Sequence, residues 1–371
     1  MSATLCPLPP MGWNSWNTFQ TRIDEQLIRD TAEAMIKTGM RDAGYVYINL
    51  DDGWMERERD ASGNLVPDRQ KFPNGLKPVG DYLHERGFKF GIYNCAGTKT
   101  CAGYPGGNGF EKRDAELYAS FGVDYLKYDW CFSDGIDAKK AYGDMADALA
   151  ATGRPIVFSL CEWGKHKPWT WEKQIGSLWR TTGDIHECYD CRERWLLGWK
   201  IILDSQVGLE QFSGPGRWND PDMLVVGRPL MPHQENKAHF SLWCLLNSPL
   251  IAGNDVRDMP EKVRLILTNK EIIALNQDPL AKQGYRYIYE ADQREVWVKP
   301  LAGGDWGVIV FNTSKEMIEK YTFDFAELKF LDGKTYKVRD LWAAADIGDT
   351  TKPFEGTLNW HDVAVLRLSP A

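Results

Sequence analysis

Hydrophobic and polar residues follow two alternating spacings along the N-terminal half of the chain. Over 24–38 the apolar residues recur at helical spacing, Gly39 follows, and 45–52 is a short apolar stretch with a polar end. This pattern predicts a helix, a glycine stop and a strand. It returns three times, as helix and strand pairs at 79–85 with 88–93, 115–120 with 123–129, and 139–151 with 155–162. Such alternation is typical of a parallel sheet with crossover helices.

Weaker signals extend this alternation through the middle of the chain. Short strands are predicted at 10–14, 178–184, 218–225 and 250–255, and helices near 195–204 and 238–246. Eight units within about 275 residues match the size of a (β/α)8 TIM barrel. A doubly wound open sheet would suit the first half equally well, but the chain has no Gly-x-Gly-x-x-Gly motif and no phosphate loop. The barrel is therefore the favoured α/β fold.

The pattern changes near residue 280. Beyond it, short alternating strands separated by turns are predicted at 295–299, 306–311, 321–325, 336–342 and 363–368. Strands of this length and spacing are typical of an antiparallel β-sandwich. We therefore predict two domains, a (β/α)8 barrel over 1–280 and a C-terminal antiparallel β-sandwich over 281–371.

Composition and charge exclude several partners. The chain has 371 residues and a net charge of -8 without a basic cluster, which argues against nucleic acid and anionic membranes. No apolar run approaches the roughly 20 residues that a membrane span needs. The first residues contain neither a basic segment nor an apolar stretch, so we expect no signal peptide, and either an intracellular protein or a mature form whose leader was replaced. The oligomeric state and the compartment stay open.

The predicted strand ends hold the candidate chemistry, because the active site of a barrel is built at the C-terminal ends of its strands. These ends supply acidic and aromatic side chains and two cations: Trp13, Trp16, Asp51, Asp52, Trp54, Tyr93, Lys127, Asp129, Glu162, Trp163, Arg180, Asp184, Asp220, Asp222 and Met223. Carboxylates pair with sugar hydroxyls and indole rings stack on sugar faces, so this set predicts a small-molecule sugar ligand. Its aspartates could hold a divalent metal, but no histidine cluster accompanies them, and we expect neither a metal nor a cofactor.

Lys127 and Asp129 share one face of their predicted strand, because successive side chains of a strand alternate. A nearby ammonium keeps a carboxylate ionised at neutral pH, as a carboxylate nucleophile requires. A simple ion pair at the strand end would explain the pair as well. A Schiff-base aldolase would use a lysine away from carboxylates, which Lys127 is not.

The eight cysteines do not form a compact disulfide framework in a chain of this length. Cys101 and Cys131 both lie in predicted loops that follow strands, which allows one bridge between them. Cys188 and Cys191 form a single Cys-x-x-Cys without a second pair, so a disulfide or two thiols is favoured over a zinc site.

Many short motifs, in order along the predicted barrel, resemble the α-galactosidase and α-N-acetylgalactosaminidase family, the melibiase-type glycoside hydrolase family 27. They are Met11-Gly-Trp-Asn-Ser-Trp16, Leu50-Asp-Asp-Gly-Trp54, Gly91-Ile-Tyr93, Lys99-Thr-Cys-Ala-Gly103, Tyr125-Leu-Lys-Tyr-Asp-Trp-Cys131, Cys161-Glu-Trp163, Trp179-Arg180 through Asp184, Trp218-Asn-Asp-Pro-Asp-Met223 and Asn276-Gln-Asp-Pro-Leu280. The resemblance implies a retaining exo-glycosidase that removes terminal α-linked D-galactose, and the chain is most similar to the α-galactosidases of the family.

The resemblance implies the catalytic roles as well. Asp129 would be the nucleophile and Asp184 the general acid and base, with Asp222 near the acid/base and the sugar 2-position. A retaining pair of this kind needs an ionised and a protonated carboxyl group about 5–5.5 Å apart. Burial would favour the protonated form of Asp184 and Arg180 would oppose it, and the sequence does not decide between them.

A further set of residues is implied to bind the sugar: Trp16, Asp51, Asp52, Tyr93, Cys101, Lys127, Glu162, Trp163, Arg180, Asp222 and Met223. Asp51 and Asp52 would hold the 4- and 6-hydroxyls, and Lys127 the 3- and 4-hydroxyls. Glu162 and Arg180 would lie by the 2-hydroxyl. A disulfide between Cys101 and Cys131 would lie next to the sugar.

Two of these positions bear on the choice of sugar. A carboxylate at Glu162 fills the space of an N-acetyl group, and the short side chain of Asp51 leaves room for the 5-hydroxymethyl group. Both favour galactose, with α-N-acetylgalactosaminidase and β-L-arabinopyranosidase of the same family as alternatives. A non-catalytic sugar-binding barrel would lack one catalytic carboxylate, and both are present. The chain departs from the family at Gly53, where a cysteine of a second common bridge would stand; the partner cysteine is absent too.

Overall fold

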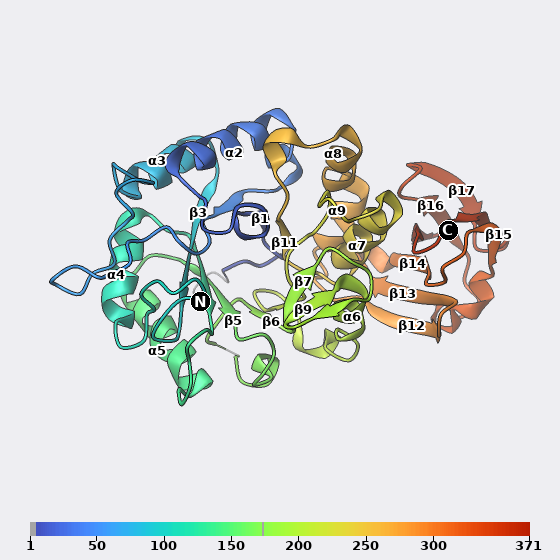
Figure 1. The fold of residues 1–371 in the computed structure, drawn as a ribbon. Coiled ribbons are helices and arrows are strands. Elements are labelled where there is room, and N and C mark those ends of the chain that lie inside the picture. Colours follow the sequence, from blue (N-terminus) through green and yellow to red (C-terminus); the bar gives the residue numbers. More distant parts are fainter. Residues whose placement is uncertain (1–4, 173) are drawn as a thin grey trace.

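The structure, a computed structural model, describes residues 5–172 and 174–371 (Figure 1). The N-terminal segment on which the expectation about a signal peptide rests lies partly outside these residues. Within them, eight parallel strands form one sheet in the order β10-β6-β5-β4-β3-β2-β1-β11. Their bounds are β1 Met11–Asn14, β2 Tyr47–Asn49, β3 Lys89–Cys95, β4 Tyr125–Asp129, β5 Val157–Cys161, β6 Leu178–Arg180, β10 Trp218–Asp220 and β11 Leu250–Ala252. A parallel bridge between Leu224 and Ala252 joins the two ends of the sheet, and the predicted barrel is confirmed.

Helices surround this sheet (Figure 1). They are α1 Trp16–Phe19, α2 Glu25–Lys37, α3 Lys77–Glu85, α4 Glu111–Phe121, α5 Ala138–Ala151, α6 Trp199–Asp204, α7 His233–Leu245, α8 Glu261–Leu267 and α9 Lys270–Asn276. The Asp24 carboxylate caps α2 by accepting from Leu27 N at 2.7 Å. Gly122 ends α4 with a φ of 79°, a left-handed conformation that glycine adopts without a Cβ clash. Such caps explain why the helical and strand patterns follow each other so regularly.

The structure corrects the predicted strand at 178–184. The barrel strand β6 ends at Arg180, and Asp184 begins β7 (Asp184–His186), which belongs to a separate three-stranded sheet, β7-β9-β8. Arg180 accounts for the break, because its Nη2 donates to the carbonyls of Thr182 and Gly183 at 3.2 and 2.9 Å and the chain folds back around the guanidinium. The predicted helix at 195–204 is also too long, since β9 (Leu196–Gly198) precedes α6 and pairs with β8 (Arg192–Glu193).

The C-terminal part of the chain is an antiparallel β-sandwich beside the barrel, as predicted (Figure 1). Its six-stranded sheet has the order β12-β13-β14-β19-β16-β17, and β15 and β18 form the second layer. The bounds are β12 Tyr285–Glu290, β13 Arg294–Pro300, β14 Trp306–Asn312, β15 Ile318–Phe323, β16 Tyr336–Asp340, β17 Ala345–Asp349, β18 Phe354–Leu358 and β19 Val363–Pro370. The boundary near residue 280 stays a prediction, between the end of α9 and the start of β12.

The central strands of the six-stranded sheet are buried on both faces. On β14, Val308 and Val310 pack into the core of the sandwich, whereas Ile309 and Phe311 belong to the core of the barrel. Helix α7 supplies much of the barrel side of this contact. In the part of the chain that the structure describes, no helix is long and apolar enough to cross a membrane.

Candidate active site

The candidate site lies at the C-terminal edge of the barrel sheet. The register places Cys95, Asp129 and Cys161 side by side at the ends of β3, β4 and β5. Side chains of paired residues in neighbouring parallel strands point to the same face, so Cys161 and Asp129 share the inner face of the barrel. Several predicted site residues therefore meet here. Cys161 lies with them, although the sequence did not single it out as a residue that contacts the sugar.

Asp129 is buried and held by two donors. Trp130 N donates to Oδ1 at 2.8 Å, and the Tyr93 hydroxyl donates to Oδ2 at 3.2 Å. Burial raises the pKa of Asp129 to about 6, against the opposing effect of Lys127, and the charge of Asp184 raises it further. Asp129 is therefore mostly ionised at neutral pH, and it begins to take up a proton when the pH falls slightly below neutral.

Lys127 forms its ion pair with Asp51 and not with Asp129, the partner in the simpler alternative that the sequence left open. Lys127 Nζ lies 2.8 Å from Asp51 Oδ2, which also accepts from Asn14 Nδ2 at 2.8 Å. Lys127 Nζ also lies 5.2 Å from the centroid of the Tyr93 ring. Side chains from β1, β3 and β4 and from the residues just after β2 thus form one polar group, in which Lys127 acts on Asp129 through space.

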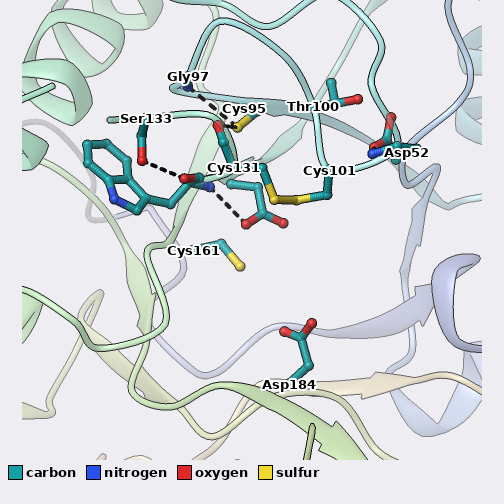
Figure 2. The surroundings of a disulfide bond; sticks show 12 residues. Asp52, Cys95, Gly97, Thr100, Cys101, Cys131, Ser133, Cys161 and Asp184 are labelled. Atoms are coloured by element: carbon teal, nitrogen blue, oxygen red, sulfur yellow. Dashed lines mark hydrogen bonds between the residues drawn. A yellow bond between two sulfur atoms is a disulfide. The ribbon is translucent and has the colours of Figure 1, made fainter. Parts of the chain in front are cut away.

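Asp52 is fully buried beside the disulfide between Cys101 and Cys131 (Figure 2). Its Oδ2 accepts from Ala102 N at 2.8 Å, while Oδ1 has no hydrogen-bond partner among the described residues. Burial raises the pKa of Asp52 to about 6. The bridge fixes the loop that carries Cys101 next to Asp129, and the Tyr93 hydroxyl lies 3.3 Å from Cys101 Sγ. The bridge that the sequence allowed is therefore present.

Arg180 joins the opposite side of the site. Its Nη2 contacts Asp184 Oδ1 at 3.0 Å and Asp222 Oδ2 at 2.9 Å, and its Nη1 lies 3.6 Å from Cys161 Sγ. Arg180 is buried, whereas the Asp184 side chain is 38% exposed. Figure 2 shows the Asp184 carboxyl group pointing toward the disulfide, with Cys161 on the same inner side. Carboxyl groups from β4 and β7 therefore face one space.

Several residues beside the strand ends have positive φ. Phe132, Trp163 and Asp222 have φ values of 50°, 58° and 79°, a region that costs free energy for residues with a Cβ and is concentrated at functional sites. Each follows β4, β5 or β10 within three residues. The strained backbone redirects the chain immediately after each strand.

The aromatic and apolar side chains that were predicted to contact the sugar lie around these polar residues. Trp16 starts α1, and its N donates to Asn14 Oδ1 at 2.8 Å. The Trp163 ring is partly buried against the barrel core, and Lys165 Nζ lies 4.5 Å from the centroid of this ring. Met223 is buried and lines a small cavity of about 30 Å³, together with Lys127, Arg180 and Asp222.

Glu162 lies apart from these residues. It is one residue beyond Cys161, so the alternation of β5 turns its side chain to the other side. Its Oε2 accepts from His166 N at 2.6 Å and lies 2.8 Å from His166 Nδ1. Its Oε1 is buried without a hydrogen-bond partner in the described part of the chain, and burial raises the pKa of Glu162. Cys161, rather than Glu162, contacts Arg180 in this structure.

No cation site emerges from the predicted aspartates among the described residues. The one group whose potential ligand atoms come together is Cys101, Asp129 and Cys131, within 4.8 Å of one another. Both sulfur atoms are already joined in the disulfide and cannot act as thiolate ligands. Cys188 and Cys191, which the sequence left open, are bridged as well.

Comparison with known proteins gives a consistent result over the whole chain. A family model described as Alpha galactosidase A matches residues 8–278, and one described as Alpha galactosidase C-terminal beta sandwich domain matches residues 291–368. Alpha-galactosidase A of Cellvibrio japonicus is 46% identical over 380 residues, which cover 99% of this chain and 93% of the relative.

Solved structures agree with this similarity. Alpha-galactosidase I of Mortierella vinacea superposes with a TM-score of 0.95 at 34% identity, covering 100% of this chain and 99% of that one. The α-galactosidase of Saccharomyces cerevisiae, solved with raffinose, has a TM-score of 0.93 at 32% identity and covers 99% of this chain and 98% of that one.

Proposed function

We propose that this chain, which belongs to glycoside hydrolase family 27, the α-galactosidase family, hydrolyses terminal α-linked galactose by double displacement. In this proposal Asp129 is the nucleophile and Asp184 the general acid and base. The observation that supports this mechanism is that two carboxyl groups in different environments face the same space. Asp129 is buried at the end of β4, and Asp184 is partly exposed on β7 and near enough to raise the pKa of Asp129. A retaining glycosidase needs one ionised and one protonated carboxyl group facing the same bond.

In the first step, an ionised Asp129 oxygen attacks the anomeric carbon. The bond to the leaving oxygen breaks, and a galactosyl ester of Asp129 forms. The contacts from Trp130 N and the Tyr93 hydroxyl fix the orientation of the attacking carboxylate. Orientation of this kind removes the entropic cost of bringing the reacting atoms together.

Asp184 donates its proton to the leaving oxygen in this step. In the second step it takes a proton from water, which attacks the anomeric carbon and releases Asp129, so that two inversions give net retention. The fork of Arg180 holds Asp184 by a single contact and Asp222 by another. The partial exposure of Asp184 suits a group that exchanges protons with water in every cycle.

The remaining polar residues are assigned to the sugar. Asp51 and Lys127 form an ion pair that faces the site, which can accept from and donate to neighbouring hydroxyls. Asp52 accepts from Ala102 N through Oδ2, and we assign its carboxylate to a sugar hydroxyl. Trp16, Trp163 and Met223 would contact the apolar faces of the ring. The ligands are then galactosides such as the raffinose bound by the yeast relative.

The test of this mechanism is the stereochemistry of the product. We expect proton NMR at early times to show α-galactose from 4-nitrophenyl α-galactoside, with β-galactose appearing only by mutarotation. Asp129→Asn should lower kcat at least about 100-fold while the thermal unfolding transition stays intact, because a group acting in chemistry contributes at least this much.

The matched control is Asp124→Asn. Asp124 directly precedes β4, at the opposite end of this strand from Asp129. Asp124 pairs with Arg154 and His84 and lies outside the site. Its replacement should leave the product configuration unchanged. Early release of β-galactose by the wild-type protein would show inversion and would refute a covalent role for Asp129.

A further inference from the structure

The segment that carries Asp184 contacts the C-terminal sandwich. After β7 the chain forms the short loop closed by the disulfide between Cys188 and Cys191, and returns through β9 to α6. Asp184 and Leu196 are paired in the parallel ladder of β7 and β9. The loop between them contains Tyr189, whose ring reaches the sandwich. A residue of the second domain therefore touches the loop that follows β7.

The contact is a flat ring stack. The rings of Tyr189 and His361 lie 3.4 Å apart between centroids with an interplanar angle of 7°. His361 lies between β18 and β19, is buried, and has a φ of 53°. Trp199 and Phe311 contact the Tyr189 ring at 5.2 and 6.5 Å. Tyr189 is thus held by aromatic groups from both domains.

His361 is itself fixed from the barrel side. Its Nδ1 lies 2.8 Å from Glu235 Oε1 on α7, and Trp199 Nε1 donates to Glu235 Oε2 at 3.1 Å. Glu235 is buried and uses one oxygen for each partner. The imidazole orientation therefore depends on α7, and the position of the Tyr189 ring depends on the imidazole.

The backbone transmits the position of Tyr189 to β7. Cys188 N donates to His186 O at 2.9 Å, and Lys200 N donates to Tyr189 O at 2.9 Å. Gly198 lies so close that an added Cβ would stand 2.5 Å from Tyr189 O. The disulfide limits the remaining freedom of the loop. Tyr189 and β7 are thus joined through this loop, and Asp222 Oδ2 holds β7 from the barrel by accepting from Ile185 N at 2.8 Å.

We propose that His361 of the C-terminal sandwich is a positioning residue for Asp184, and that it acts through its ring stack on Tyr189. This inference rests on the proposed role of Asp184 as general acid. The sandwich thereby contributes to the reaction without touching the sugar. The ion pair of Asp184 with Arg180 aims the carboxyl group, and the stack holds the loop that follows β7.

Leaving-group dependence separates this role from a purely structural one. A poor leaving group such as methanol needs the proton of the acid, whereas 4-nitrophenolate leaves with little help. A misplaced acid therefore lowers kcat/KM for methyl α-galactoside more than for 4-nitrophenyl α-galactoside. Loss of folded protein lowers both equally, so the ratio of the two values reports the position of Asp184.

The experiment compares His361→Asn and His361→Phe with wild type. Asparagine tolerates a positive φ and can still donate to Glu235, but it lacks the ring. Phenylalanine keeps a ring on Tyr189 and loses the bond to Glu235. We expect His361→Asn to lower kcat/KM for the methyl glycoside at least about fivefold more than for the nitrophenyl glycoside, in line with the cost of small misplacements. His361→Phe should change the ratio less than His361→Asn does, because it keeps a ring on Tyr189.

Four further variants complete the design. Phe330→Ala removes an aromatic contact within the sandwich, on Trp306, and should leave the ratio at its wild-type value. Tyr189→Ala should behave like His361→Asn. The double variant should change the ratio little further, because both substitutions remove the same contact. Asp184→Ala sets the scale for complete loss of the acid.

The outcomes are distinguishable. An unchanged ratio in His361→Asn together with a large change in Asp184→Ala would overturn the positioning role and leave the proposed mechanism standing. An unchanged ratio in Asp184→Ala would refute the acid assignment itself. Equal loss on both substrates in His361→Asn, accompanied by a lower unfolding temperature, would show a structural role only and would also overturn the proposal.

Discussion

At the residue scale, burial governs the charge of three carboxyl groups around the site. It raises the pKa values of Asp129, Asp52 and Asp220 to about 6 each. Lys127 opposes this effect at Asp129, and Arg180 opposes it at Asp220. Neither cation restores the ordinary value, because removing a carboxylate from water costs more than these single interactions return.

A pH dependence follows for the nucleophile. Only ionised Asp129 can attack, and its pKa lies near 6, so kcat/KM should fall as the pH decreases through about 6. At one pH unit below the apparent pKa the value should be roughly one tenth of its plateau, since each proton bound inactivates one molecule. The apparent pKa belongs to the coupled carboxyl groups together.

Measuring kcat/KM for 4-nitrophenyl α-galactoside from pH 3.5 to 8 tests this prediction. Asp60→Asn, which changes an exposed aspartate on the surface, provides the control and should leave the acidic limb in place. An acidic limb below about pH 4.5 would contradict a buried Asp129 with a raised pKa as the group that must lose its proton.

The choice of sugar depends on which side chain borders the 2-position. The sequence assigned this role to Glu162, but Glu162 is turned toward His166, while Cys161 shares the inner face with Asp129 and contacts Arg180. We therefore propose that Cys161, with its small side chain, borders the 2-position, and that Glu162 acts there through the loop that it holds.

We expect 4-nitrophenyl α-galactoside to be cleaved at least about tenfold better in kcat/KM than the corresponding α-N-acetylgalactosaminide, a difference of roughly 1.4 kcal/mol. Cys161→Gly should narrow this ratio more than Glu162→Ser, because it opens space on the inner face. Parallel assays with the β-L-arabinopyranoside test the remaining family alternative. Similar wild-type rates on both α-glycosides would contradict the preference, and a larger effect of Glu162→Ser would return the role to Glu162.

At the element scale, the sequence was sufficient wherever a pattern repeats. All eight barrel strands were predicted, four of them from a recurring helical stretch, stop and apolar strand, and the other four from weaker signals that extend this pattern. The sandwich was recognised for the same reason, although β12, β17 and β18 were missed. β17 is mostly exposed and has no apolar face from which a strand could be predicted.

The candidate site was predictable to the extent that it follows strand parity and family motifs. Asp129, Arg180, Asp184 and Asp222 come together as expected. The sheet of β7, β9 and β8 was not foreseen, because the turn before Asp184 depends on carbonyls bound to the Arg180 side chain. Such a contact between a side chain and its own loop leaves no periodic signal. The contact of Glu162 with His166 was not foreseen, and the proposed role of Glu162 at the sugar stays a prediction.

At the scale of the whole molecule, the junction between barrel and sandwich buries a charged residue. Lys299 on β13 is fully buried and donates to Asn247 Oδ1 and to Leu275 O in the barrel. Burial lowers the pKa of Lys299 to about 7, while Asp278 and Cys244 oppose this effect. The unfolded chain therefore binds more protons at this position than the folded chain does between about pH 7 and the ordinary lysine value.

This difference predicts a contribution to stability that grows with pH. The free energy of unfolding of wild type, minus that of Lys299→Met, should rise by up to about 1.4 kcal/mol per pH unit above pH 7 and level off above about pH 10. Denaturant unfolding at several pH values measures it, and the exposed Lys320→Met on β15 serves as the control. A difference that is constant or falls with pH would show that Lys299 stays protonated on folding.

The two-sided burial of the six-stranded sheet constrains how this protein can change in length. Val308 and Val310 face one partner, and Ile309 and Phe311 face the other. Inserting or deleting one residue in β14 would exchange these faces along the rest of the strand. Gains and losses of residues between homologues should therefore be confined to the turns of the sandwich, such as 313–317 and 341–344. The junction with the barrel would be inherited at constant strand length.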